Sequence, residues 1–271
     1  MKIKVSEVFY SLQGEGRFVG VPSVFLRTYG CNFKCAGFGC KTGELSTEAD
    51  DVAKNIDQYK DFLSLPLVNT GCDSYASWDP NFKHLSPVRN IDDITSSICD
   101  ILPRGRWHDE HLVITGGEPL LGWQRAYPDL LSHDKMKSLK EMTFETNGTQ
   151  RLSDDFSKYL MQWQRNRAKD AITFSVSPKL SISGEKWEDA ICPDVIAQYK
   201  IHGFVYLKFV VATKEDVKEA EQAVEEYKKK GFTGPVYLMP CGGVESVYNL
   251  NARNVAIEAM NRGWRYSDRL Q

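Results

Sequence analysis

The sequence predicts an α/β fold built on a parallel sheet, and three observations support this prediction. From about residue 90 onward, short runs rich in β-branched and aromatic residues alternate with helical stretches. Two of the helical stretches end at a glycine that acts as a stop signal. Polar or glycine-rich motifs follow four successive strand candidates, at the position where parallel sheets carry their chemistry. We therefore expect a parallel sheet with helical crossovers, open or curled toward a partial barrel.

Six strands are predicted, each short and bounded by glycine, proline or polar residues. They cover residues 23–29, 111–115, 142–146, 171–177, 204–211 and 235–239. Helices are expected from the spacing of apolar residues and from their start and stop signals. They cover residues 91–102, 152–167, 193–203, 214–231 and 250–263.

One segment interrupts this alternation. Residues 36–71 contain one amphipathic helix, at roughly 47–63, and no strand. We interpret this segment as an insertion that lies over the neighbouring cysteine loop. The whole chain, 1–271, is expected to form a single domain that contains this insertion.

Composition narrows the class of protein. The 271 residues are 42% hydrophobic and carry a formal net charge of -2, which argues against a dedicated nucleic-acid binder. No apolar run is long enough to cross a bilayer, and the first residues lack the apolar stretch of a signal peptide. We therefore expect a cytoplasmic protein without direct membrane or nucleic-acid contacts.

The cysteines suggest a metal centre rather than disulfides. They stand at positions 31, 35, 40, 72, 99, 192 and 241, and an odd number without a signal peptide does not indicate a disulfide framework. Cys99 and Cys192 fit buried structural thiols. Cys31 and Cys35 follow a predicted strand, and thiolates at this spacing can converge on one soft metal centre. For this pair alone, two unrelated small apolar side chains are an equally good interpretation.

The order of motifs resembles the radical S-adenosylmethionine superfamily and, within it, the 7-carboxy-7-deazaguanine synthase family. The resemblance covers nearly the whole chain. It rests on SLQGEG (11–16), FLR (25–27), GCNFKC (30–35), GCDSYASW (71–78), TGGEPLL (115–121), ETNGT (145–149), SVSPK (175–179), LKFVV (207–211), LMP (238–240) and GWRYSDRL (263–270). It implies a partial (β/α)6 barrel of the radical S-adenosylmethionine type, with a helical insertion in the cluster-binding loop.

The resemblance implies that Cys31, Cys35 and Cys72 hold a 4Fe–4S cluster. The third cysteine of the family is followed by Asp and a hydroxyl residue, as Cys72 is by Asp73 and Ser74. Cys40 is the rival third ligand because it is nearer in sequence, but it lacks that Asp and hydroxyl. The aromatic residue usually found just before the third cysteine is missing, since Gly71 stands there.

Three protein thiolates leave one iron open, and the resemblance implies that S-adenosylmethionine chelates it. Glu118 offers an acceptor for the methionyl ammonium group, although a strand-end turn with an incidental Glu is the simpler interpretation of that motif alone. Glu145 and Asn147 are expected to hold ribose hydroxyls, and Met239 and Pro240 to flank the adenine. The full set of expected cofactor residues is Gly116, Gly117, Glu118, Glu145, Asn147, Ser175, Ser177, Lys179, Met239 and Pro240.

Substrate contacts are expected at the N-terminal loop and the first predicted strand. The expected residues are Leu12, Gln13, Gly14, Glu15, Gly16 and Arg27. The fork of Arg27 can pair with a substrate carboxylate, while pairing with an internal carboxylate such as Glu15 is the alternative. By resemblance, Ser74 supplies a hydroxyl ligand for Mg²⁺.

The implied reaction is the conversion of 6-carboxy-5,6,7,8-tetrahydropterin to 7-carboxy-7-deazaguanine with release of ammonia, and S-adenosylmethionine is regenerated. Its product enters 7-deazapurine synthesis of the queuosine type. The resemblance also implies an electron donor such as flavodoxin or ferredoxin, and a homodimer. A glycyl-radical activase and a non-catalytic interaction protein are the alternatives.

Overall fold

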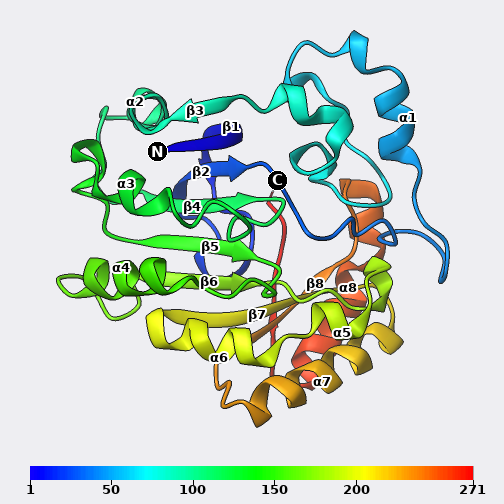
Figure 1. The fold of residues 1–271 in the computed structure, drawn as a ribbon. Helices are drawn as coiled ribbons and strands as arrows, with labels where there is room; N and C mark the ends of the chain where they lie inside the picture. Colours follow the sequence, from blue (N-terminus) through cyan, green and yellow to red (C-terminus); the bar gives the residue numbers. More distant parts are fainter. Residues whose placement is uncertain (271) are drawn as a thin grey trace.

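The computed structural model describes residues 1–270, and a nine-stranded sheet forms its centre (Figure 1). Along the sheet the strands follow the order β3-β1-β2-β4-β5-β6-β7-β8-β9. Six of them lie side by side in the sheet, and each pairs in parallel with the next. These six are β2 (Pro22–Thr28), β4 (His111–Gly116), β5 (Met142–Thr146), β6 (Ile172–Val176), β7 (Phe204–Val211) and β8 (Val236–Pro240). The predicted α/β fold with a mostly parallel sheet is confirmed.

Three further strands extend the sheet beyond the prediction. β1 (Lys2–Leu12) and β3 (Val88–Asn90) add antiparallel strands at one edge, and β9 (Arg265–Tyr266) pairs in parallel with β8 at the other. The start of β1 carries a recognisable signal, because the buried Ile3 and Val5 alternate with lysines. β9 is too short to produce any pattern.

The crossover helices begin at side-chain caps where the sequence supplies them. Asn90 accepts from the N–H of Asp93, and Thr213 forms a capping box with Asp216. The helices after the cysteine region are α2 (Ile91–Ile101), α3 (Tyr127–Ser132), α4 (Asp154–Gln164), α5 (Trp187–Ala190), α6 (Pro193–His202), α7 (Lys214–Lys229) and α8 (Glu245–Asn261). The helix α8 begins earlier than predicted, and its N-cap residue, Val244, has no capping side chain to mark the start. Helix α3 was not predicted.

Short 3-10 helices occupy several connections. They span Gly16–Phe18, Ile56–Gln58, Phe62–Ser64, Tyr75–Ser77, Pro80–Leu85, Asp134–Met136 and Ser181–Ser183. No helix within residues 1–270 has the length and apolar character to span a membrane.

The segment 36–71 contains less regular helix than its pattern predicts. Its α-helix, α1 (Glu48–Lys54), ends at Asn55, and two 3-10 turns follow in place of the expected helix to residue 63. Figure 1 shows α1 at the outer edge of the molecule, beyond the carboxyl ends of the strands. Val52 and Ile56 pack against a small apolar cluster that contains the buried Tyr75 and Phe82.

The main core lies between the sheet and its helices. Phe144 on β5 stacks on Phe174 on β6, and Phe174 stacks on Tyr199 of α6, with all three side chains fully buried. Because β2, β4, β5 and β6 pair in parallel, the loops that follow them lie at one edge of the sheet.

Candidate active site

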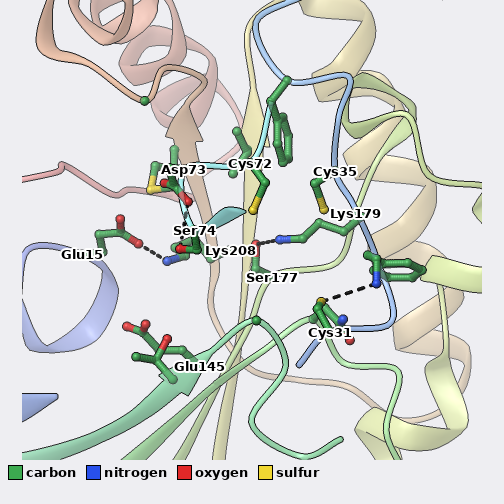
Figure 2. A pocket seen from close by; sticks show the side chains of 18 of the residues that line it. Glu15, Cys31, Cys35, Cys72, Asp73, Ser74, Glu145, Ser177, Lys179 and Lys208 are labelled. Carbon is green, nitrogen blue, oxygen red and sulfur yellow. Dashed lines mark hydrogen bonds and ion pairs between the residues drawn. The ribbon is translucent and has the colours of Figure 1, made fainter. Parts of the chain in front are cut away.

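A pocket opens at the carboxyl ends of the parallel strands, and most of the expected site residues line it (Figure 2). The expected residues in its lining are Gln13, Glu15, Arg27, Cys31, Cys35, Cys72, Ser74, Gly116, Gly117, Glu145, Asn147, Ser175, Ser177, Lys179, Met239 and Pro240. Four expected residues are not part of the lining: Leu12, Gly14, Gly16 and Glu118. Residues predicted from distant motifs therefore converge on one cavity.

Cys31, Cys35 and Cys72 are brought together in this pocket from two loops (Figure 2). Cys35 has φ of 50°, the only positive φ among the described non-glycine residues, so the loop is held in an unfavourable conformation at this thiol. Burial raises the pKa of Cys31 to about 12 and that of Cys72 to about 11, and it also raises the pKa of Cys35. Buried thiolates therefore need a cationic partner, and soft metals provide one.

Cys40, the rival third ligand, lies apart from the other three candidate thiols. Within residues 1–270, no group of three or more His, Cys, Asp or Glu side chains is placed to hold one metal ion. Cys40 is absent from the pocket lining, and its thiol donates to the carbonyl oxygen of Ala36 at 3.7 Å. A further buried thiol, Cys241, does line the pocket and was not predicted there.

Phe38 supplies an aromatic ring beside the third cysteine, which the sequence left without one. The ring lines the pocket and packs in the apolar cluster that includes Cys35 and Cys72. Lys179 places its ammonium nitrogen 5.9 Å from the ring centroid. The signal in the sequence was an aromatic residue shortly after Cys35, but more than thirty residues separate it from Cys72 along the chain.

Glu118 lies outside the pocket lining and is hydrogen-bonded within the protein. Its carboxylate is fully buried and accepts from the Thr146 hydroxyl at 2.8 Å, the Asn147 N–H at 2.7 Å and the Leu120 N–H at 3.0 Å. Burial raises the pKa of Glu118 to about 7, and these hydrogen bonds oppose the rise without cancelling it. The carboxylate therefore joins the loops after β4 and β5, and its contact with a cofactor stays a prediction.

The glycines next to Glu118 are required by close packing against the cysteine loop. A Cβ on Gly116 would lie 2.1 Å from the carbonyl oxygen of Thr28, and one on Gly117 would lie 2.7 Å from the Cβ of Cys31. The motif therefore brings the end of β4 into direct contact with the first cysteine.

The predicted ribose-binding residues already have partners in the protein. Glu145 accepts from the Gln13 side-chain amide at 2.9 Å, and Asn147 donates to the side chain of Asn32 at 2.9 Å. At the next strand end, Lys179 donates to the Ser177 hydroxyl at 3.2 Å. Glu145 thus links the predicted cofactor strand ends to the predicted substrate loop.

A buried network of charges, largely unforeseen, occupies the opposite side of the pocket. Glu15 pairs with Lys208 on β7 and, at 2.9 Å, with Arg269 near the C-terminus; Arg269 also pairs with Asp73 at 2.6 Å. Burial alone would raise the pKa of Glu15, but the charges of Lys208 and Arg269 outweigh it and hold the pKa at about 2. Lys208 had one signal in the sequence, as the only charged residue in an apolar strand. Arg269 lies within the GWRYSDRL motif, but its pairing with Glu15 had no local signal.

Arg27 pairs with a carboxylate other than the one considered. Its Nε lies 3.2 Å from Glu7 on the neighbouring strand, whereas Glu15 is held by other cations. A second nitrogen donates to the Ser74 hydroxyl at 3.1 Å, and that hydroxyl donates to Asp73 at 3.1 Å. Arg27 therefore orients the residue predicted to bind Mg²⁺.

Leu12, Gly14 and Gly16 of the N-terminal loop lie outside the pocket lining. Leu12 is half exposed, and the carbonyl oxygen of Gly14 accepts from the N–H of Leu270 at 3.2 Å. Gly16 has φ of 66°, and a Cβ there would lie 2.4 Å from the Tyr206 hydroxyl, so only glycine fits.

The parallel sheet and the three-thiol pocket at its strand ends define a protein of the radical S-adenosylmethionine class. No protein-family model matches the chain. It is 30% identical over 277 residues to the 7-carboxy-7-deazaguanine synthase of Halobacterium salinarum, covering 99% of this chain and 88% of the relative. It is 28% identical to the enzyme of the same name from Pyrobaculum aerophilum, covering 99% and 93%. The chain belongs to the 7-carboxy-7-deazaguanine synthase family.

Among solved structures, the chain resembles the one titled crystal structure of QueE from Escherichia coli. The TM-score is 0.56 at 21% identity, with 98% of this chain and 93% of that chain covered. This similarity supports the fold.

Proposed function

We propose that this protein converts 6-carboxy-5,6,7,8-tetrahydropterin to 7-carboxy-7-deazaguanine with release of ammonia, as a step in queuosine-type 7-deazapurine synthesis. One observation carries the proposal. The pocket joins the three thiols to the Gln13–Glu15 loop and to Arg27, in a chain related to the named synthases over nearly its full length. Residues 1–271 would act as one domain of the partial-barrel type, with the 36–71 segment as an insertion.

Membership of the family implies a 4Fe–4S cluster and S-adenosylmethionine. Cys31, Cys35 and Cys72 would hold the cluster, and their burial among Phe33 and Phe38 would keep water away from it. When bound, the pair supplies the radical chemistry that the side chains cannot perform. Met239, Pro240 and Asn147 line the same cavity and would contribute to cofactor binding.

The substrate would lie between the charge network and the thiols. Arg27 uses Nε for Glu7 and one terminal nitrogen for Ser74, which leaves its other terminal nitrogen to bind a substrate carboxylate. Gln13 and Glu15 would bind the polar edge of the pterin ring. Lys208 and Arg269 support this arrangement because they keep Glu15 ionised inside the protein.

Mg²⁺ would bind at Ser74, with substrate oxygens and water completing its coordination. The position of Ser74 in the lining, between Arg27 and Asp73, supports this assignment. An electron donor such as flavodoxin or ferredoxin and a homodimeric assembly complete the proposal.

The test is anaerobic reconstitution with iron and sulfide, followed by incubation with the carboxypterin, S-adenosylmethionine, Mg²⁺ and a reductant. We expect 7-carboxy-7-deazaguanine by mass spectrometry, with many product molecules formed for each S-adenosylmethionine consumed. Cleavage of S-adenosylmethionine without any pterin product would reject this reaction and favour the glycyl-radical activase.

A further inference from the structure

The C-terminal segment 267–270 passes over the substrate side of the pocket and contacts the N-terminal loop through its backbone. The Leu270 N–H donates to the Gly14 carbonyl oxygen at 3.2 Å, and the Gly16 N–H donates to the Ser267 hydroxyl at 2.9 Å. The segment is anchored from its other side, where the Tyr248 hydroxyl of α8 donates to Asp268 at 2.7 Å. Arg269 is therefore presented to the pocket from a fixed backbone.

Each nitrogen of the Arg269 guanidinium contacts a different segment of the chain. Nε donates to Glu15 at 2.9 Å, one terminal nitrogen donates to Asp73 at 2.6 Å, and the other donates to the Gly242 carbonyl oxygen at 2.8 Å. A planar guanidinium holds its donors in a rigid fork, so it fixes the relative position of its three partners. An ammonium group cannot reproduce this geometry.

We propose that Arg269 is a positioning residue that locks the Gln13–Gly16 loop to the Asp73–Ser74 loop. It thereby fixes the carboxylate predicted to bind the pterin relative to the hydroxyl predicted to bind Mg²⁺. Figure 2 shows Glu15, Lys208 and Asp73 on one side of the pocket, facing Cys31 and Cys35 on the other. The inference builds on the proposed function and adds a residue to it.

The consequences of losing Arg269 are unequal for its two carboxylates. Glu15 would keep Lys208 as a partner, whereas Asp73 has no other ion pair within residues 1–270. Asp73 would then face Glu15 as a like charge and is partly exposed, so it can turn toward solvent. Ser74 would lose its fixed place next to Arg27.

The experiment compares Arg269→Gln with Arg265→Gln in the reconstituted full chain. Arg265 lies in the same C-terminal region, and it contacts the Tyr237 hydroxyl rather than either loop, so the control removes the same charge. Hydrogen exchange is followed by mass spectrometry in peptides covering residues 13–18 and 72–78. We expect faster exchange in both peptides in Arg269→Gln and in neither peptide in Arg265→Gln.

A third variant tests the contact of Arg269 with Asp73 separately from its contact with Glu15. Asp73→Asn should speed exchange in 72–78 and leave 13–18 protected, because Arg269 still holds Glu15. Unchanged exchange in Arg269→Gln, or a change confined to one of the two peptides, overturns the proposal. If Arg269→Gln does not fold, Arg269→Lys is judged by the same comparison, because a point charge cannot span three partners.

Kinetics provide the second measurement. We expect the KM for the carboxypterin to rise about tenfold in Arg269→Gln, a change of about 1.4 kcal/mol, with little effect of Arg265→Gln. Because hydrogen exchange needs no turnover, it tests the lock even if the wild-type protein fails to make the expected product. A missing product would reject the proposed function alone.

Discussion

The backbone N–H of Gly71 donates to the carbonyl oxygen of Phe38 at 2.7 Å, so the two ends of the segment 36–71 meet next to Cys72. Between these two residues, only Gly39 and Asn69 line the pocket. The rest of the segment covers the outside of the loop, and the Tyr75 hydroxyl donates to the Pro66 carbonyl oxygen at 2.8 Å. The segment 36–71 therefore extends outward from ends that are hydrogen-bonded to each other, and most of it lies outside the pocket.

Replacing residues 40–68 with a short glycine linker should lower stability and spare the metal site. Tyr75 and Phe82, which are buried under this segment, would become exposed. Full burial of a large apolar side chain stabilises the fold by about 1.5–3 kcal/mol, so the midpoint of thermal denaturation should fall markedly. Iron and sulfide per folded protein should match the wild type. Loss of the cluster in the folded fraction would contradict this. As a control, Leu63→Ser with Leu67→Ser, at two exposed positions, should change neither quantity.

The proposed ligand set predicts which thiols the cluster needs. Cys31→Ala, Cys35→Ala and Cys72→Ala should each abolish the visible absorbance of the reconstituted cluster, because each removes a thiolate that faces the pocket. Cys40→Ala should keep it, since Cys40 is not in the lining. The opposite pattern, with the cluster lost in Cys40→Ala and kept in Cys72→Ala, would exchange the two assignments.

Most strands of the sheet and many residues of the pocket could be predicted from the sequence, because both follow from local patterns. A strand such as 204–211 can be recognised from a few consecutive residues, and so can the motif that follows it. Parallel strands then bring those motifs to one edge of the sheet. The GWRYSDRL motif contains Arg269, but the pairing of Arg269 with Glu15 was not predictable, because that contact joins the two ends of the chain and has no local pattern. The place of Phe38 was not predictable for a related reason, since its hydrogen-bond partner Gly71, next to Cys72, lies far from it along the chain.

Arg27→Ala should weaken binding of the carboxypterin and leave reductive cleavage of S-adenosylmethionine largely intact. Loss of a buried charged hydrogen-bonding partner costs on the order of 2–5 kcal/mol. Isothermal titration with the pterin and a cleavage assay without it measure the two effects. Arg27→Lys is the matched variant, and it should restore only part of the affinity because it loses the fork. Unchanged pterin affinity in Arg27→Ala would remove this residue from the substrate site.

The Mg²⁺ proposal predicts a response that depends on the Ser74 hydroxyl. Turnover of the wild type should rise with added Mg²⁺, and Ser74→Ala should blunt that rise, because it removes the proposed hydroxyl ligand. Ser74→Thr keeps the hydroxyl and should behave like the wild type. Titrations of activity against Mg²⁺ in the three proteins decide the question. Equal wild-type turnover in a chelator that spares the cluster would show that Mg²⁺ has no role.

Glu118 should make the stability of the cluster-free protein fall as the pH rises through the neutral range. Burial raises its pKa in the folded protein from 4.5 to about 7, so the folded state retains a proton that the unfolded state releases. The stabilisation is complete below about pH 4.5 and is lost as the pH rises to about 7, and it amounts to roughly 3 kcal/mol.

Urea denaturation of the wild type and Glu118→Gln between pH 5 and 8 measures this effect. The glutamine cannot titrate, so the stability of the wild type relative to the variant should decline across the range. The variant also places an amide next to the N–H groups of Asn147 and Leu120, which shifts its stability by an amount independent of pH. Glu44→Gln, at an exposed position, should track the wild type throughout. A constant difference between wild type and Glu118→Gln from pH 5 to 8 would mean that Glu118 is already ionised in the fold at pH 5.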